Sequence, residues 1–440
     1  MTKDEAKREA LAALEAAQED IIGLAHDLLR HPETGYREVR TAEQVAAAFA
    51  ARNIPHRRGL ALTGVKGTLR GRSAGPTVAV LGEMDSLIVP DHPYADPVTG
   101  AAHACGHHGQ VAAMLGVARA LTDSGVIGHL DGNVALFAVP AEELIDVEYR
   151  QELRRQGKIA FMGGKAELIH LGEFDDIQAA MLCHAASGAF QLGIPESTNG
   201  FVTKVARFRG RSSHAAASPH RGINALYAAT LALDAINAQR ETFRDEDHVR
   251  VHPILTKGGD VVNAIPAEVR LETFVRARTR EAIEDAARKV DRALKAGALA
   301  MGAAVTITTL PGYLPLINHP ALVRTFRENA VALAGEEAVV ALPHVTASTD
   351  MGDLSQVLPV VQPSVAGSTG STHGPDFVAV DEATAYLLQA KALALTVIDL
   401  LWDGARRARE VAATRPAMTK AEYLAYLREM EREETFTGLD

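Results

Sequence analysis

The chain has 440 residues, a formal net charge of −10 and two cysteines. This length exceeds one ordinary hydrophobic core, so two domains are expected. The negative charge argues against nucleic acid as a partner, and two cysteines give no disulfide framework, which suits a reducing, cytoplasmic compartment.

The N-terminus opens with charged residues and lacks the apolar core of a signal peptide. The apolar run at residues 392–402 is interrupted by Asp399, so no bilayer-length segment is expected. Residues 3–30 have the apolar periodicity of a helix, and a second helix is predicted at residues 39–51. We expect no membrane partner.

Short continuous apolar runs at residues 77–82, 133–139 and 179–184 are typical of strands buried on both faces. A buried helix is predicted at residues 111–121, between the first two strands. Strands alternating with helices indicate a mostly parallel α/β layer.

From about residue 199 the pattern changes. Strands at 202–209, 249–256, 268–276 and 304–309, with helices at 222–238 and 280–296, follow the order βαββαβ of the ferredoxin-like unit. We therefore predict a catalytic domain formed by residues 1–198 and 311–440, with an α+β domain inserted at 199–310. Helices are expected at 320–334 and 383–401, and the charged segment after Arg406 is expected to be helical.

The stretch from Ala102 to Val111 combines three histidines with a thiol just before a predicted helix. Cys105 and His107 are two residues apart, so they cannot share a helical face, but both can reach one ion from the preceding loop. The helix N-terminus and a metal would make the thiol easier to deprotonate. A buried structural cysteine beside ordinary histidines is the alternative. Thiolate and imidazole ligands favour zinc.

Two further predicted strands end in residues of the same chemistry. Glu142 and Glu143 follow a strand directly and point in different directions, so one can bind a metal while the other serves as a general base. An acidic surface turn is the alternative. His184 ends the third strand, and Cys183 on the opposite face is better explained by packing.

Other candidates are more distant in the sequence. His373 lies in a Gly/Ser/Thr-rich loop and would be a last ligand returning after the inserted domain. In that domain, His214 could stabilise an oxyanion, while Asn263 and Arg276 are candidate donors to a substrate carboxylate. Each of these could also be an ordinary turn or surface residue.

Taken together, these segments resemble the co-catalytic metallopeptidase family of aminoacylases, hippurate hydrolases, auxin-conjugate amidohydrolases and aminobenzoyl-glutamate hydrolases, in its thiolate-ligand branch. The resemblance covers nearly the whole chain. It rests on an ordered set of motifs: Gly82-Glu-Met-Asp-Ser-Leu, His103-Ala-Cys-Gly-His107, Pro140-Ala-Glu-Glu143, His184, Ser213-His-Ala, Gly222-Ile-Asn-Ala, Asn263-Ala-Ile-Pro and His373.

The resemblance implies a two-domain enzyme with one or two divalent ions, zinc or manganese or else cobalt. The inserted domain would be a lid and, in many members, the dimer interface. Glu142 would be the general acid/base, Asp85 would orient a ligand, and His214 would be a lid histidine able to reach a neighbouring subunit's site. The implied metal ligands are Cys105, His107, Glu143, His184 and His373.

One departure from the branch is Cys105-Gly-His107-His108-Gly-Gln110, because the branch usually has Asp after the second ligand. This replacement leaves a one-metal site open and suggests His108 as a substrate-binding residue. The predicted function is metal-dependent hydrolysis of a C–N bond in a small carboxylate-bearing molecule, an N-acyl or aryl amide of an amino acid. The alternatives are hydrolytic deamination of an aminobenzoate-like amine and, from another class, a non-catalytic small-molecule binding protein.

Overall fold

The computed structural model describes residues 1–438, and the chain divides into two compact units. Unit 1 comprises Met1–Glu196, Ile317–Pro343 and Asp353–Lys420. Unit 2 comprises Ser197–Leu316, His344–Gly352 and the residues from Ala421 onward. Unit 2 therefore interrupts unit 1 in the sequence.

Unit 1 is built on a twisted sheet in the order β1-β2-β6-β3-β7-β15. The inner pairs β3–β6, β3–β7 and β7–β15 are parallel, whereas β1–β2 and β2–β6 are antiparallel. This mostly parallel α/β layer is the fold class expected from the sequence. The strands are β1 (His56–Leu60), β2 (Gly64–Arg70), β3 (Ser73–Glu83), β6 (Asp131–Val139), β7 (Ala179–Met181) and β15 (Val360–Val361).

Shorter strands carry the connections beyond this sheet. A second sheet has the order β14-β9-β16-β8, and two small ribbons pair β4 with β5 and β17 with β18. These strands are β4 (Leu87–Ile88), β5 (Ala101–Ala102), β8 (His184–Ala185), β9 (Leu192–Pro195), β14 (Val339–Leu342), β16 (Ser364–Val365), β17 (Ser368–Thr369) and β18 (Val378–Ala379).

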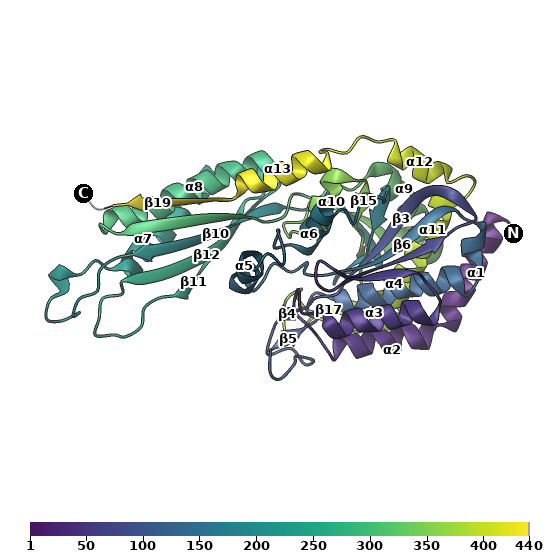
Figure 1. The fold of residues 1–440 in the computed structure, drawn as a ribbon, viewed down its shortest axis with the longest axis horizontal. Helices are drawn as coiled ribbons and strands as arrows, with labels where there is room; N and C mark the ends of the chain where they lie inside the picture. Colours follow the sequence, from purple (N-terminus) through teal and green to yellow (C-terminus); the bar gives the residue numbers. More distant parts are fainter. Residues whose placement is uncertain (439–440) are drawn as a thin grey trace. The chain divides into compact units, whose positions relative to one another are not determined.

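Helices cover the main sheet, and α1 to α4 lie together beside it (Figure 1). α4 packs on β3, and α11 packs on both α4 and α9. Their apolar faces form one continuous core with Val78, Val80 and Leu136 of the sheet. The helices of this part are α1 (Lys3–Ala16), α2 (Gln18–Leu29), α3 (Val39–Ala51), α4 (His107–Thr122), α5 (Val147–Arg155), α6 (Gly164–Leu171), α9 (Pro320–Ala334), α10 (Met351–Val357), α11 (Gln389–Leu401) and α12 (Arg406–Ala412).

A π-helical turn, Ala383–Leu388, leads directly into α11. By length and composition alone, the stretch Ala383–Leu401 could cross a membrane, but 89% of its most apolar window is buried inside the protein. Here it serves as a core helix.

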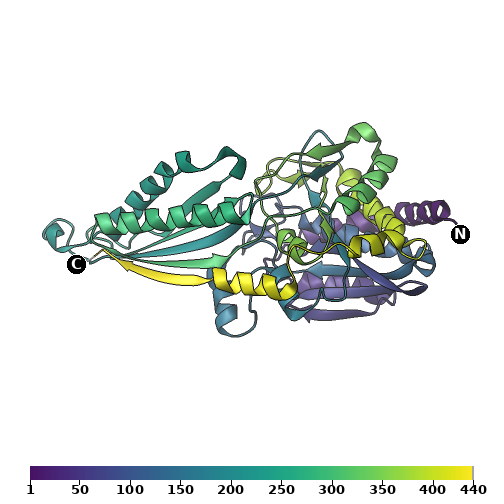
Figure 2. The same cartoon turned by 90° about the horizontal axis from the view of Figure 1, so that it is seen from above.

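Unit 2 is an antiparallel sheet in the order β11-β12-β10-β13-β19, with α7 and α8 packed together on it (Figure 2). The chain order β10–α7–β11–β12–α8–β13 is the βαββαβ order expected from the sequence. Its elements are β10 (Gly200–Arg209), α7 (Ala225–Ala238), β11 (Arg250–Lys257), β12 (Glu268–Ala277), α8 (Arg280–Ala300), β13 (Ala304–Pro311), α13 (Lys420–Met430) and β19 (Arg432–Thr437).

The structure corrects two details of the sequence analysis. The helix expected at residues 3–30 is two helices, because the chain turns at Ala17 between α1 and α2. The segment after Arg406 is helical only as far as Met430, and β19 then pairs with β13 in unit 2. Residues 311–440 therefore do not all belong to the unit that contains the main sheet. Charged residues suit an edge strand with exposed side chains, so apolar periodicity gave no sign of β19.

Candidate metal centre

Three strands deliver their carboxyl ends to one edge of unit 1. Glu83, the last residue of β3, pairs in register with Val139, the last residue of β6. Asp85 therefore emerges beside the Pro140–Glu143 loop, and α4 begins at His107 on the same side. Ligand sites of open α/β sheets form at this edge because the connecting loops converge there.

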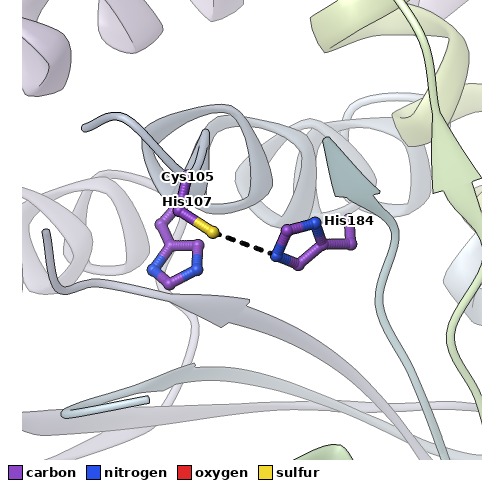
Figure 3. A group of neighbouring side chains, drawn as sticks. All are labelled: Cys105, His107 and His184. Carbon is purple, nitrogen blue, oxygen red and sulfur yellow. Dashed lines mark hydrogen bonds between the residues drawn. The ribbon is translucent and has the colours of Figure 1, made fainter. Parts of the chain in front are cut away.

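Cys105 and His107 stand on either side of a tight turn into α4. Gly106 between them has φ +82°, a conformation that favours glycine. The Sγ of Cys105 lies 3.3 Å from Nε2 of His184, and Figure 3 shows the sulfur pointing toward that ring. The three residues offer donor atoms that lie within 4.8 Å of one another.

Both imidazoles present Nε2 to this cluster for the same reason. Nδ1 of His107 lies 2.9 Å from the carbonyl oxygen of Asp85, and Nδ1 of His184 lies 2.9 Å from the carbonyl oxygen of Ala185. A carbonyl oxygen only accepts, so each Nδ1 carries a proton and each Nε2 is the ring nitrogen left to bind a metal. This arrangement is typical of metal-binding histidines.

A second set of donors shares the same thiol. Cys105, Glu143 and His373 also lie within 4.8 Å of one another, and Nε2 of His373 is 3.2 Å from Oε1 of Glu143. The His373 backbone has φ +68° and donates its N–H to the carbonyl of Ala104, which ties the distant loop to the Cys105 turn.

The loop that carries Glu142 and Glu143 is fixed by buried partners. Ala141 has φ +55°, and its N–H donates to the fully buried carboxyl of Glu38. The guanidinium of Arg150, also fully buried, donates to the carbonyls of Ala141 and Glu143. The two carboxylates therefore have fixed directions.

Asp85 connects this loop to the histidine cluster. One carboxylate oxygen accepts the N–H of Glu143 at 2.8 Å, and the other lies 3.4 Å from Nδ1 of His107. The expected orienting role of Asp85 agrees with this position.

The electrostatics of the cluster suit a cation. Burial raises the pKa of the Cys105 thiol well above its usual value, and Glu143 adds to this effect. In the protein alone, the thiol is thus harder to deprotonate, contrary to the effect expected of the helix N-terminus. Burial opposes ionisation of Glu143, but His373 lowers the pKa of that carboxyl to about 2.

Buried polar atoms without a hydrogen-bond partner also indicate a metal site. Within residues 1–438, Nε2 of His107, Oδ1 of Asp85 and Oε1 of Glu143 are buried without a hydrogen-bond partner. Buried polar atoms are normally satisfied, so this set of thiol, imidazole and carboxylate groups fits a divalent metal ion.

Two residues near the cluster were given no role in the sequence analysis. Glu83 lies with His107 and Glu142 in a third set of donors within 4.8 Å, and Lys165 of α6 is 2.6 Å from Glu83. Glu83 belongs to the motif at the end of β3, where only Asp85 was assigned a role. No sequence pattern singled out Lys165, because it lies in an ordinary helical segment 82 residues after Glu83.

His108 does not join the cluster. Its Nε2 lies 3.1 Å from the hydroxyl of Tyr386, its ring packs on His103, and it is buried. Burial lowers the pKa of His108 to about 3, so it is neutral. This position does not support the expected contact with substrate. The reason is helical geometry, since His107 and His108 leave α4 in different directions.

The candidate residues of unit 2 lie at two separate places. His214 and Asn263 are neighbours, since His214 bridges to Ala264 and Asn263 accepts the N–H of Ala215. Both are exposed and follow the Arg209 end of β10.

Arg276 pairs with Phe201 at the other end of β10 and donates to the hydroxyl of Ser348 at 2.7 Å. Eight residue steps separate Phe201 from Arg209, which is roughly 26 Å at about 3.3 Å per residue. Within one copy of the chain, Asn263 and Arg276 therefore cannot bind the same substrate carboxylate, and the role of each in substrate binding stays a prediction.

Comparison with known proteins agrees with this geometry. The family model of Peptidase family M20/M25/M40 matches residues 79–396. The Xaa-Arg dipeptidase of Mus musculus is 29% identical over 433 residues, which cover 91% of this chain and 90% of that protein. The N-acetyl-L-cysteine deacetylase of Bacillus subtilis (strain 168) is 26% identical over 76% of this chain and 80% of its own length.

A similar solved structure is that of the Bacillus subtilis YXEP protein, described as a dinuclear metal binding peptidase from the M20 family. Its TM-score is 0.67 at 21% identity, with 88% of this chain and 99% of that chain covered. The family model spans most of the chain, and the donor cluster lies within the matched residues. The chain therefore belongs to Peptidase family M20/M25/M40 and is a metal-dependent hydrolase of C–N bonds.

Proposed function

We propose that this enzyme hydrolyses the amide bond of an N-acyl or aryl amide of an amino acid, a small substrate that bears a carboxylate. One observation carries the proposal. The carboxylate of Glu142 lies beside the metal-ligand cluster without being needed to complete it, with Oε2 3.9 Å from Nε2 of His107. A binding protein has no use for such a base, whereas a hydrolase requires one.

The two sets of donors that share Cys105 would hold the metal. Cys105, His107 and His184 would bind one ion, and Cys105, Glu143 and His373 a second. Thiolate and imidazole favour zinc, with manganese or cobalt as alternatives, and occupancy of one set alone would give a one-metal enzyme. When bound, the cation supplies Lewis-acid chemistry, which polarises the scissile carbonyl and acidifies water.

Glu142 supplies the proton transfers. Its carboxylate accepts a proton from the attacking water and returns that proton to the leaving nitrogen, so the carbonyl carbon gains oxygen as the C–N bond breaks. The Glu38 and Arg150 contacts keep the loop in place during both transfers.

The test compares Glu142→Gln with Glu148→Gln, which changes an exposed carboxylate on α5. Glu142→Gln should retain the bound metal and lose about 10²- to 10⁴-fold in kcat, while Glu148→Gln should behave as wild type. Substrates should include N-acyl amino acids and aminobenzoates, with the released nitrogen compound identified. Ammonia released from ring amines alone would favour deamination, and unchanged turnover in Glu142→Gln would refute the mechanism.

We further propose a homodimer that forms through unit 2. β11 is an edge strand with exposed Ile254 and Leu255, and Tyr227 and Leu231 of α7 are also exposed. Exposed apolar edges favour pairing with a second copy. A dimer would also allow His214 and Asn263 of one copy to serve the site of the other. Sedimentation of Ile254→Lys against wild type would test this, with a shift to monomer expected.

The thiol in the cluster supports a reducing compartment, the cytoplasm, as the location. Both cysteines are free and buried. Persistent oxidation of Cys105 would remove the donor common to both sets.

A further inference from the structure

Glu83 and Lys165 form an ion pair that is completely buried. Nζ of Lys165 donates to Oε1 of Glu83 at 2.6 Å, and both side chains have 0% exposure. Burying two charges has a desolvation cost that the attraction between them often only offsets. Stability alone is therefore a weak reason for this pair.

Gln110 fixes the other half of the Glu83 side chain. Its Nε2 donates to Oε2 of Glu83 at 2.8 Å, while its Oε1 accepts the backbone N–H of the same residue at 3.2 Å. Gln110 lies three residues after His107 in α4, so both side chains leave the helix on one face. Glu83, Gln110 and Lys165 are referred to below as the Glu83 clamp.

Lys165 reaches the clamp because α6 approaches the catalytic loop very closely. A Cβ on Gly164 would lie 1.6 Å from the carbonyl oxygen of Pro140, so only glycine permits this approach. The helix therefore places Lys165 directly behind Glu83, next to the loop of Glu142.

The clamp directs one oxygen of Glu83 at His107. Oε2 of Glu83 lies 3.2 Å from Nε2 of His107, yet that nitrogen has no hydrogen-bond partner within residues 1–438. Because Nδ1 of His107 donates to a carbonyl, Nε2 is the ring nitrogen left to bind an ion, and a cation between Nε2 and Oε2 would replace a proton held between the two groups. A separation of roughly 3.3 Å is expected between two ligands of one tetrahedral ion with bonds of about 2.0–2.1 Å.

We propose that Glu83 is a further carboxylate ligand of the ion bound by His107, and that Lys165 and Gln110 are its positioning residues. This inference rests on the metal centre of the proposed function. Lys165 neutralises the oxygen that faces away from the cluster, and Gln110 sets the rotation of the carboxylate.

The test measures metal binding by competition with a chromophoric zinc chelator, after removal and return of zinc. Glu83→Gln should weaken binding of one zinc equivalent by about 10- to 100-fold, and Lys165→Met should weaken it by up to a similar factor. Cobalt substitution gives a second readout, since loss of a carboxylate ligand should change the visible absorption of the Co²⁺ enzyme. Lys204→Met is the matched control, because it removes an equally buried lysine from unit 2 and should leave zinc affinity unchanged.

The double variant Glu83→Gln/Lys165→Met separates positioning from folding. It leaves no unpaired buried charge, so it should fold, and its zinc affinity should match that of Glu83→Gln alone if Lys165 acts through Glu83. Additive losses would refute that positioning role. Unchanged zinc affinity and an unchanged cobalt spectrum in Glu83→Gln would overturn the ligand assignment. The proposed function would be unaffected, because it depends on Glu142→Gln retaining metal without turnover.

Discussion

Each unit buries a lysine beside a carboxylate, and the two lysines have different surroundings. In unit 2, Nζ of Lys204 contacts Asp291 at 2.7 Å and Thr309 at 2.8 Å, and Arg432 reaches the same aspartate. This network joins β10, α8, β13 and β19, and Lys204, Asp291, Thr309 and Arg432 contact one another within unit 2. In unit 1, the partner of Lys165 turns its second oxygen toward an unsatisfied imidazole. A buried ion pair therefore indicates a site when one partner also faces a cluster of metal-binding side chains, as Glu83 does and Asp291 does not.

The largest effect is expected from breaking the pair in unit 2. Asp291→Ala leaves Lys204 buried without its counter-charge and should lower the free energy of unfolding by about 3–5 kcal/mol. Urea denaturation would measure this loss, while zinc content should remain that of wild type. The compensating variant Lys204→Met/Asp291→Leu should recover most of the stability. A loss of zinc in Asp291→Ala would contradict the contrast between the units.

At Asp85 a smaller effect is expected, on metal binding rather than on stability. Asp85→Asn removes the charge of the carboxylate that accepts the N–H of Glu143 and lies 3.4 Å from Nδ1 of His107. Zinc affinity should fall about 10- to 100-fold, with little change in the urea midpoint of the zinc-free protein. Chelator competition and denaturation on the same preparation would separate the two quantities. A variant that loses stability but keeps its zinc affinity would place Asp85 with the structural networks.

Asp399 provides a carboxylate of unit 1 that has no part in the cluster. Burial opposes its ionisation, but hydrogen bonds from Lys7, Lys3 and Asn329 lower the pKa of Asp399 below its usual value. A lowered carboxyl pKa stabilises the fold at pH values above the unfolded pKa of about 3.9, and this contribution is lost as the pH falls through the folded value.

Asp399→Asn should therefore be less stable than wild type near pH 7, and the difference should shrink as the pH falls below about 4. Urea midpoints at several pH values would test this, with metal content as the control. A difference that does not change with pH would show that packing, rather than charge, explains the loss.

The smallest effects are expected at the helix caps of unit 2. The side chain of Asn224 accepts the N–H groups of Leu226 and Tyr227 at the start of α7, and Thr279 caps α8 through Ala282. Replacing either cap with alanine should reduce the free energy of unfolding by about 1 kcal/mol. Neither change should alter zinc affinity or kcat, and an effect on either quantity would mean that unit 2 is coupled to the cluster.

The fold could be predicted where local sequence determines local structure. α3 and α9 have the bounds expected from apolar periodicity, and the buried strands β3 and β6 lie where continuous apolar runs indicated them. β19 could not be predicted in this way, because its pairing depends on β13 and its own residues are mostly charged and exposed.

The same contrast between local sequence and long-range packing applies to the candidate site. Cys105 lies just before α4, Glu143 follows β6 and His184 begins β8, so motif order and the family resemblance were enough to group them. Glu83 and Lys165 meet through the close approach of α6 to Pro140, which depends on packing around Gly164. His108 points away from the cluster, because a residue adjacent to a ligand in sequence leaves the helix in another direction, so its role in substrate binding stays a prediction.

The pairing of β19 also affects how the chain folds as it leaves the ribosome. β13 is synthesised more than a hundred residues before β19, so its outer edge has no strand partner while the second half of unit 1 is being made. An unpaired strand edge is a template for aggregation in a nascent protein. Soluble yield should therefore depend on the synthesis of β19. A stop codon before Arg432 should lower the soluble yield more than the loss of a few exposed residues would suggest.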